Sequence, residues 1–134
     1  MILVIDDQEV VCETIAMVLR SQKYIVYTAN NGFDALAQLR DAPVDLVISD
    51  LSMPGMSGFE VISAIGARYP MMPVVAMSGA YGADRVPRSV AFYAKGQGPE
   101  KLLSIVEQVL SQDRDSRERA VRNVKERASG AEEP

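Results

Sequence analysis

Residues 44–60 read VDLVISDLSMPGMSGFE, and this stretch decides the fold. Its first part, Val44–Ser49, is largely apolar and β-branched, which is typical of a strand buried on both faces. Asp50 ends that strand, and a Met-Pro-Gly turn follows it. Ser57 and Glu60 then have the spacing of a capping box, which opens a helix. The stretch therefore predicts a strand, a carboxylate at its carboxyl end, and a helix that returns across the sheet.

Strand-like and helix-like segments alternate along the rest of the chain. Further strands are predicted for four short apolar runs, Ile2–Ile5, Tyr24–Thr28, Pro73–Met77 and Val90–Ala94. Helices are predicted where apolar residues recur at helical spacing, in residues 8–21, 32–40, 58–68 and 99–110. Such alternation indicates an α/β fold with a parallel sheet covered on both faces. Five strands suit the doubly wound, flavodoxin-like order 2-1-3-4-5.

The connection between the fourth and fifth predicted strands is unusual. Residues 78–89 read SGAYGADRVPRS, with two Gly, a Pro and no helical periodicity. A crossover between parallel strands needs about a dozen residues and usually contains a helix. We therefore expect a short or irregular fourth helix at this position.

Composition excludes several kinds of chemistry. The 134 residues include no His and one Cys, so His-based catalysis, a His or Cys metal site and an intrachain disulfide are all excluded. Any metal must bind oxygen ligands, as Mg²⁺, Mn²⁺ and Ca²⁺ do. Cys12 falls within a helical pattern, and we interpret it as a small core residue.

Charge divides the chain into two parts. Residues 113–134 hold 6 basic and 6 acidic residues, so the whole net charge of −4 belongs to residues 1–112. We predict a folded domain over 1–112 and a charged extension over 113–134, whose helix continues to about Arg127 and then frays. Opposite charges at i,i+4 favour that helix, in the pairs Asp113–Arg117, Asp115–Arg119 and Glu118–Arg122. The extension is either a solvated tail or a helix that docks a partner or a second copy.

The same features bear on location and partners. An acidic balance gives no electrostatic footprint for nucleic acid, and no apolar run approaches the ~20 residues of a membrane span. The start of the chain lacks the pattern of a signal peptide. We expect a cytoplasmic protein that contacts neither nucleic acid nor membrane directly.

Polar residues that suit phosphoryl chemistry follow four of the predicted strands. They are Asp6 and Asp7, Asp50, Ser78, and Lys95. In open α/β sheets ligands bind beyond the carboxyl ends of the strands, so these residues should share one pocket. Three adjacent carboxylates repel one another unless a cation lies among them. A hard divalent cation meets this need, and Mg²⁺ requires only one or two direct carboxylates plus waters. Taken singly, each residue also suits a helix cap, a turn or a solvated charge, and only the joint pattern points to phosphoryl binding with a carboxylate nucleophile.

At these residues the sequence resembles the receiver domain of bacterial two-component response regulators. The resemblance is carried by residues 2–7 (ILVIDD), 47–58 (VISDLSMPGMSG), 77–79 (MSG) and 94–95 (AK), and it covers residues 1 to about 112.

The resemblance implies a role for each matching position. Asp50 would accept the phosphoryl group from a histidine kinase or a histidine phosphotransfer protein. Asp7 would ligate Mg²⁺ directly, Asp6 through water, and Ser52 through its backbone carbonyl. Lys95 and Ser78 would contact the phosphoryl group, and Phe92 would be the switch aromatic. The protein would act by contact with a downstream protein, and beyond its own phosphorylation and dephosphorylation it would not be an enzyme.

Two departures from the family pattern affect the output of the switch. Ser78 and Lys95 are 17 residues apart, about five fewer than usual in the family, and Gly96 replaces the usual Pro after the Lys. Three alternatives stay open: a phosphorylation-independent binding module, a receiver cut from a longer regulator, and a carboxylate-nucleophile phosphatase. Ser52 argues against the phosphatase, because that class needs an Asp at this position.

Overall fold

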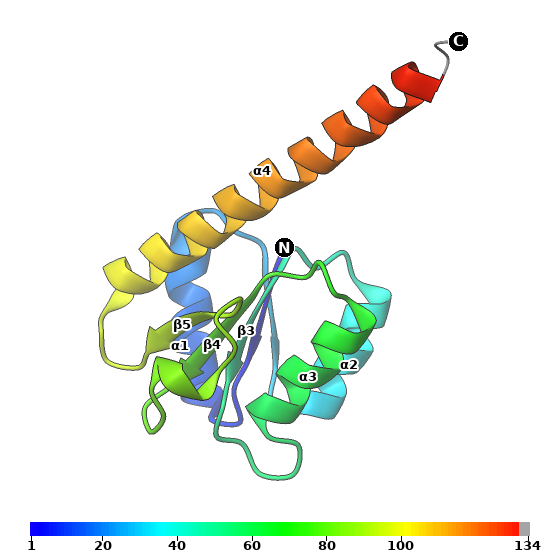
Figure 1. Cartoon of the computed structure of the whole chain (residues 1–134). Coiled ribbons are helices and arrows are strands. Elements are labelled where there is room, and N and C mark those ends of the chain that lie inside the picture. Colours follow the sequence, from blue (N-terminus) through cyan, green and yellow to red (C-terminus); the bar gives the residue numbers. More distant parts are fainter. Residues whose placement is uncertain (132–134) are drawn as a thin grey trace.

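A computed structural model describes residues 1–131, with side chains through Arg127. Its centre is a five-stranded parallel sheet in the order β2-β1-β3-β4-β5, as the sequence predicts (Figure 1). The strands are β1 (Ile2–Ile5), β2 (Val26–Ala29), β3 (Leu46–Asp50), β4 (Val74–Ser78) and β5 (Ala91–Ala94). The helices are α1 (Glu9–Ser21), α2 (Gly32–Asp41), α3 (Gly58–Arg68) and α4 (Pro99–Ala131), with one 3₁₀ turn, η1 (Ala83–Arg85).

The helices cover the two faces of the sheet separately, and each face has its own core. On one face α1 and α4 pack on the strands through Cys12, Leu19, Leu102 and Val106, among others. On the other face α2 and α3 do so through Ala35, Leu39, Val61 and Ile65. Three strands, β1, β3 and β4, are buried at every residue, which explains their continuous apolar sequence.

Three predicted strands lie one or two residues further along the chain than expected. For the third and fourth strands this places Asp50 and Ser78 inside the ladder, as their last residues. For the second strand the cause is the turn after α1. Lys23 has a φ of 69°, so Tyr24 and Ile25 still belong to the approach to β2.

The helix starts agree with the capping signals. Ser57 caps α3 by accepting a hydrogen bond from the Glu60 amide, and Pro99 is the first residue of α4. The connection between β4 and β5 contains only the three-residue η1, in agreement with the expected short or irregular helix.

The last helix leaves the body of the protein and projects away from it (Figure 1). α4 passes through residues 112 and 113 without interruption and ends at Ala131, four residues beyond the predicted end near Arg127. Of the three expected i,i+4 pairs, Asp113–Arg117 is present, because Arg117 Nε lies 3.0 Å from Asp113 Oδ2. The pairs Asp115–Arg119 and Glu118–Arg122 are not within ion-pair distance in the described part of α4. The domain boundary itself stays a prediction, and residues 132–134 of the predicted frayed end lie outside the described residues. Within residues 1–131, no helix has the length and apolar character that a bilayer crossing requires.

Candidate functional site

Two acidic residues follow β1 and lie in very different surroundings. Asp6 is fully buried, whereas Asp7 is exposed. One carboxylate oxygen of Asp6 accepts a hydrogen bond from the Gln8 amide at 2.9 Å. The other, Oδ2, has no hydrogen-bond partner among the described residues. A buried carboxylate oxygen without a donor is costly, so a cation belongs beside it.

Asp50 is the last residue of β3 and is only 3% exposed. Its Oδ1 accepts a long hydrogen bond of 3.4 Å from the Ser52 amide. Burial raises the pKa of Asp50 above its ordinary value of 3.8, and the charge of Asp6 raises it further, whereas the charge of Lys95 lowers it. The site thus holds a carboxylate that is poorly solvated and repelled by a neighbour, which makes added positive charge favourable.

Lys95 joins the two buried carboxylates. Its Nζ lies 3.0 Å from Asp6 Oδ2 and 3.3 Å from Asp50 Oδ2, and its backbone amide donates to the Ser78 carbonyl at 2.8 Å. Both contacts of the ammonium are ion pairs. Burial alone would lower the pKa of Lys95, but its contact with Asp6 and the charges of both carboxylates raise it. Lys95 is therefore charged and offsets one of the two buried negative charges.

Three carboxylates of this cluster are placed to hold a metal ion. One oxygen from each of Asp6, Asp7 and Asp50 lies within 4.8 Å of the others. Oxygens bound to one Mg²⁺ at about 2.1 Å are at most about 4.2 Å apart, so small shifts or an intervening water bring this set into range. The donor set is purely oxygen and includes the orphaned Asp6 Oδ2, and it fits a hard divalent cation. The Ser52 carbonyl stays a prediction as the fourth ligand.

Ser78 stands at the end of β4, one residue beyond Met77, which is the register partner of Asp50. It is 2% exposed, and its Oγ accepts hydrogen bonds from the amides of Ala80 at 2.9 Å and Tyr81 at 2.8 Å. These bonds use its acceptor capacity, so its hydroxyl proton is free to be donated. Ser78 is thus fixed in place at the end of β4, on the strand next to the one that ends at Asp50, and its role as a donor stays a prediction.

Phe92 lies in β5 opposite Ala76 and is partly exposed. Its neighbour Tyr93 is buried in the core formed with α1 and α4, so Phe92 points to the other face of the sheet. On that face the β4–β5 connection provides η1 instead of a longer helix. A switch role for Phe92 stays a prediction.

Two features of the site did not follow from sequence reasoning. The first is the physical reason for a Gly at position 58. The sequence motif includes this Gly, eight residues after Asp50, but does not explain it. A Cβ there would lie 1.9 Å from the Asp50 carbonyl oxygen and 2.5 Å from Leu51 Cα, so only Gly lets α3 begin this close to the end of β3. No signal in the sequence indicates this contact.

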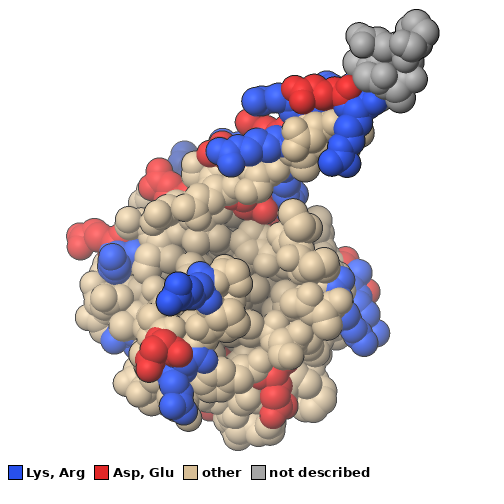
Figure 2. All heavy atoms as spheres, viewed as in Figure 1, with Lys and Arg blue, Asp and Glu red and all other residues tan. Residues whose placement is uncertain are grey.

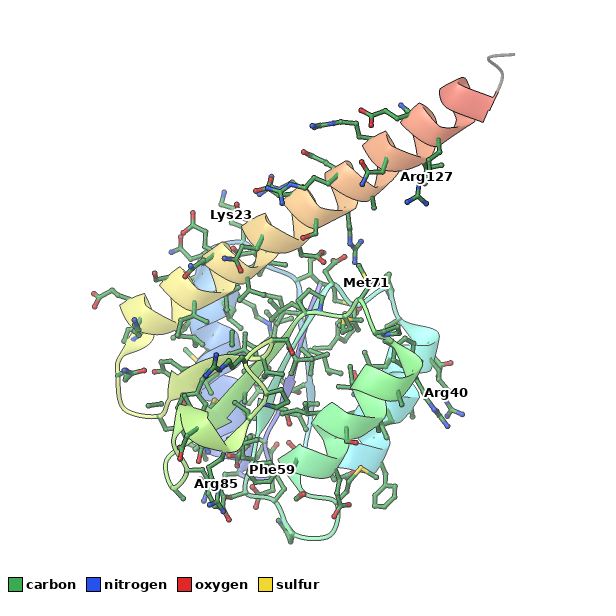
Figure 3. All side chains as sticks on the ribbon, viewed as in Figure 1. Lys23, Arg40, Phe59, Met71, Arg85 and Arg127 are labelled. Carbon is green, nitrogen blue, oxygen red and sulfur yellow. The ribbon has the colours of Figure 1, made fainter. Side chains whose placement is uncertain are left out.

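The second feature is a small cluster beside Ser78. Tyr81, whose amide is bonded to Ser78, forms a T-shaped pair with the Phe59 ring, with 5.3 Å between ring centroids. The Arg85 guanidinium lies 5.4 Å from the Tyr81 ring centre, as a cation–π contact. Figure 3 places Phe59 and Arg85 at the same end of the molecule. The cluster connects the Ser78 turn to the start of α3.

The burial of Cys12 agrees with the interpretation of this residue as part of the core. It is fully buried, and burial raises the pKa of its thiol to about 11, with the charges of Asp6 and Glu13 adding to the effect. The thiol is therefore protonated at neutral pH and takes no part in the site.

Comparison with known proteins agrees with this geometry. Residues 2–97 match the family model described as the response regulator receiver domain. The chain is 40% identical over 77 residues to response regulator RR06 of Streptococcus pneumoniae serotype 2 (strain D39), a match that covers 58% of this chain and 35% of RR06. It thus spans about a third of the length of that relative.

Solved structures give the same result at the level of the fold. The chemotaxis protein CheY4 of Vibrio cholerae superimposes with a TM-score of 0.74 at 28% identity, covering 81% of this chain and 96% of CheY4. NtrX of Brucella abortus superimposes with a TM-score of 0.83 at 28% identity, covering 89% of this chain and 28% of NtrX.

Proposed function

Because the chain belongs to the response regulator receiver domain family, we propose that it is a switch phosphorylated on Asp50 in a two-component or phosphorelay system. The observation that carries the proposal is the setting of Asp50. It is almost fully buried, lies 3.3 Å from the Lys95 ammonium, and shares an oxygen cluster with Asp6 and Asp7. A buried carboxylate beside a fixed cation and a metal-sized oxygen set is suited to take up a phosphoryl group.

The proposed step uses a phosphohistidine supplied by a histidine kinase or a histidine phosphotransfer protein. A carboxylate oxygen of Asp50 attacks the phosphorus in line, a new O–P bond forms, and the N–P bond to the imidazole breaks. The imidazole nitrogen keeps the electron pair and takes up a proton. Lys95 turns from the carboxylates toward a phosphoryl oxygen, and the Ser78 hydroxyl donates to another.

The cation proposed for the site is Mg²⁺, held by Asp6, Asp7, Asp50 and the Ser52 carbonyl. When bound, it would supply positive charge that offsets the charge on the phosphoryl oxygens. Asp6 Oδ2 supports this assignment, because it is buried, accepts no hydrogen bond among the described residues, and is paired only with the Lys95 ammonium. Lys95 alone does not balance the two buried carboxylates.

The output in this proposal is contact with another protein. Phosphorylation shifts a conformational equilibrium, and the chain is not an enzyme beyond its own phosphorylation and hydrolysis. We place this signalling in the cytoplasm, without direct contact to nucleic acid or membrane.

A homodimer through the C-terminal helix stays a prediction. It rests on Val121 and Val124, which are 56% and 65% exposed on the projecting part of α4. Sedimentation velocity of the full chain and of a Val121→Glu/Val124→Glu variant tests it. If the wild type sediments as a dimer and the variant as a monomer, the contact is supported. If both proteins sediment as monomers, it is contradicted.

Labelling with a small acyl phosphate donor tests the proposed function. The wild type should take up one phosphoryl group only when Mg²⁺ is present, and Asp50→Asn should take up none. A wild type that stays unmodified with Mg²⁺ would overturn the proposal and favour a phosphorylation-independent binding module on the same fold.

A further inference from the structure

The part of the sheet beside the β4–β5 connection has no covering helix from that connection. The other three crossovers place helices of 13, 10 and 11 residues on the sheet, whereas the β4–β5 connection contains only the three-residue η1. Beside α3 this leaves a groove of about 390 Å³. It is lined by Phe59, Ile62, Ser63, Ile65, Gly66, Tyr69, Pro70, Met72, Val74, Val86, Pro87, Ser89 and Val90.

The walls and floor of the groove suit an apolar helix. Its apolar side chains outside α3 include Val74, the first residue of β4, and Val86 and Val90 of the connection, which are only partly buried. The α3 wall presents small residues, Ser63 and Gly66, and a Cβ on Gly66 would meet no atom within 4 Å. Small residues on one helix allow the axis of a second helix to come close, within the usual 8–10 Å.

Charge indicates what kind of helix fits. Residues 58–94, from α3 through β5, contain three Arg and two acidic residues, Glu60 and Asp84, a net charge of +1. The remaining residues of 1–112 contain 5 basic and 10 acidic residues, a net charge of −5. Arg85 and Arg88 are exposed on the connection, beside the lining residues Val86, Pro87 and Ser89. Figure 2 shows basic side chains on this face, with acidic ones next to some of them. The occupant should therefore carry acidic residues beside its apolar stripe.

The chain's own exposed helix does not meet that requirement. Residues 113–127 of α4 contain 6 basic and 4 acidic residues, so this segment has the same sign of charge as residues 58–94. Its exposed apolar residues, Val121 and Val124, are flanked by Arg117 and Lys125. The same segment of a second copy is disfavoured for the same reason.

We propose that the groove between α3 and the β4–β5 connection binds an amphipathic, acidic helix of a partner protein. The bound helix occupies the place of a crossover helix, with apolar residues at i, i+3 or i+4, and i+7 in the groove and carboxylates beside Arg85 and Arg88. This surface lies apart from Asp50, and the inference does not depend on phosphorylation.

A synthetic helical peptide serves as the probe. It has 14 residues, Leu at positions 4, 7, 8 and 11, Glu on the flanking positions and Ala elsewhere, and a second peptide carries Lys in place of every Glu. Each is titrated into the ¹⁵N,¹³C-labelled full chain. The Glu peptide should shift methyl signals of Ile62, Val86 and Val90 and bind at least about tenfold more tightly than the Lys peptide, a difference of about 1.4 kcal/mol.

Two neighbouring substitutions on α3 separate groove binding from other effects. Gly66→Phe fills the groove from a position with open space and should weaken binding of the Glu peptide at least about tenfold. Ala67→Phe, which adds the same ring at an exposed residue outside the lining, should leave the affinity within about twofold. The Arg85→Glu/Arg88→Glu variant should reverse the preference and bind the Lys peptide more tightly.

Three results of the titrations would overturn the proposal. They are no methyl shifts in the groove at millimolar peptide, equal weakening by Gly66→Phe and Ala67→Phe, and no change of preference in the double Arg variant. Self-association of the wild type that Gly66→Phe abolishes would assign the groove to a second copy and so also overturn it. Unfolding curves of each variant confirm that it is folded during the titration.

Discussion

Replacing Gly58 by Ala should damage both the stability of the protein and the chemistry of Asp50. The added Cβ would lie 1.9 Å from the Asp50 carbonyl oxygen, whereas ordinary van der Waals contact begins at 3.4 Å. Either α3 or the end of β3 must therefore move by about 1.5 Å, the difference between these distances. The close atoms are backbone atoms of Asp50 and Leu51, so no flexible side chain can absorb the shift.

The two expected effects have different sizes. Overpacking of this kind costs about 1–3 kcal/mol, and the backbone contact puts Gly58→Ala at the upper end, about 3 kcal/mol. Displacement of a reacting group by about 1 Å costs on the order of 100-fold in rate. Urea unfolding measures the first effect, and the rate of Mg²⁺-dependent labelling by an acyl phosphate measures the second.

Gly66→Ala is the matched control on the same helix. Its Cβ would meet nothing within 4 Å, so the substitution should stabilise the protein by about 0.5–1 kcal/mol through helix propensity and leave labelling unchanged. If Gly58→Ala were as stable as this control and were labelled as fast as the wild type, the proposed reason for Gly58 would be wrong.

Three further predictions concern buried ionisable groups. Burial, followed by the charge of Asp6, raises the pKa of Asp50, so its ionised form weakens the folded state. In Mg²⁺-free buffer Asp50→Asn should therefore have a higher free energy of unfolding than the wild type at pH 7. This gain in stability should shrink as the pH falls toward 3.8 and be absent below it. Urea unfolding between pH 3 and 8 measures the gain, and a gain that grew toward low pH would contradict the prediction. Lys95→Met leaves Asp6 and Asp50 buried without their cation. Because the Lys95 side chain is 26% exposed, we expect the free energy of unfolding to fall by about 2–3 kcal/mol, less than for a fully buried pair. Mg²⁺ should partly restore this stability in the same assay. The Cys12 thiol, with a pKa of about 11, should resist a disulfide reagent at pH 8 until urea unfolds the chain, and rapid reaction of the native protein would disprove its burial.

Much of the fold is predictable from the sequence because local signals and topology agree. Apolar runs mark the buried strands, and the spacing of Ser57 and Glu60 marks the start of α3. The rule that parallel strands present their carboxyl ends at one edge brings Asp6, Asp50 and Lys95 together, as the structure shows. Strand limits were less accurate, because the turn at Lys23 and the last ladder residues depend on pairing with neighbouring strands.

Other features depend on packing between segments that are distant in the sequence. The contact of Lys95 with both buried carboxylates and the orphaned oxygen of Asp6 require side-chain placement. The cluster of Phe59, Tyr81 and Arg85 has no local signal, because Phe59 meets Tyr81 only after α3 and the β4–β5 connection pack together. The groove beside α3 is likewise a result of that connection being short. The sequence indicates the missing helix but not the surface that its absence leaves.

The central claim is that Asp50 is the residue that takes up the phosphoryl group. The most direct measurement is peptide mapping by mass spectrometry after labelling with an acyl phosphate and Mg²⁺, with borohydride reduction to convert the aspartyl phosphate to a stable product. The account predicts one reduced residue, Asp50, and no reduced residue when Mg²⁺ is removed by chelation. Modification at Asp6 or Asp7 in place of Asp50, or an unmodified chain in the presence of Mg²⁺, would contradict it.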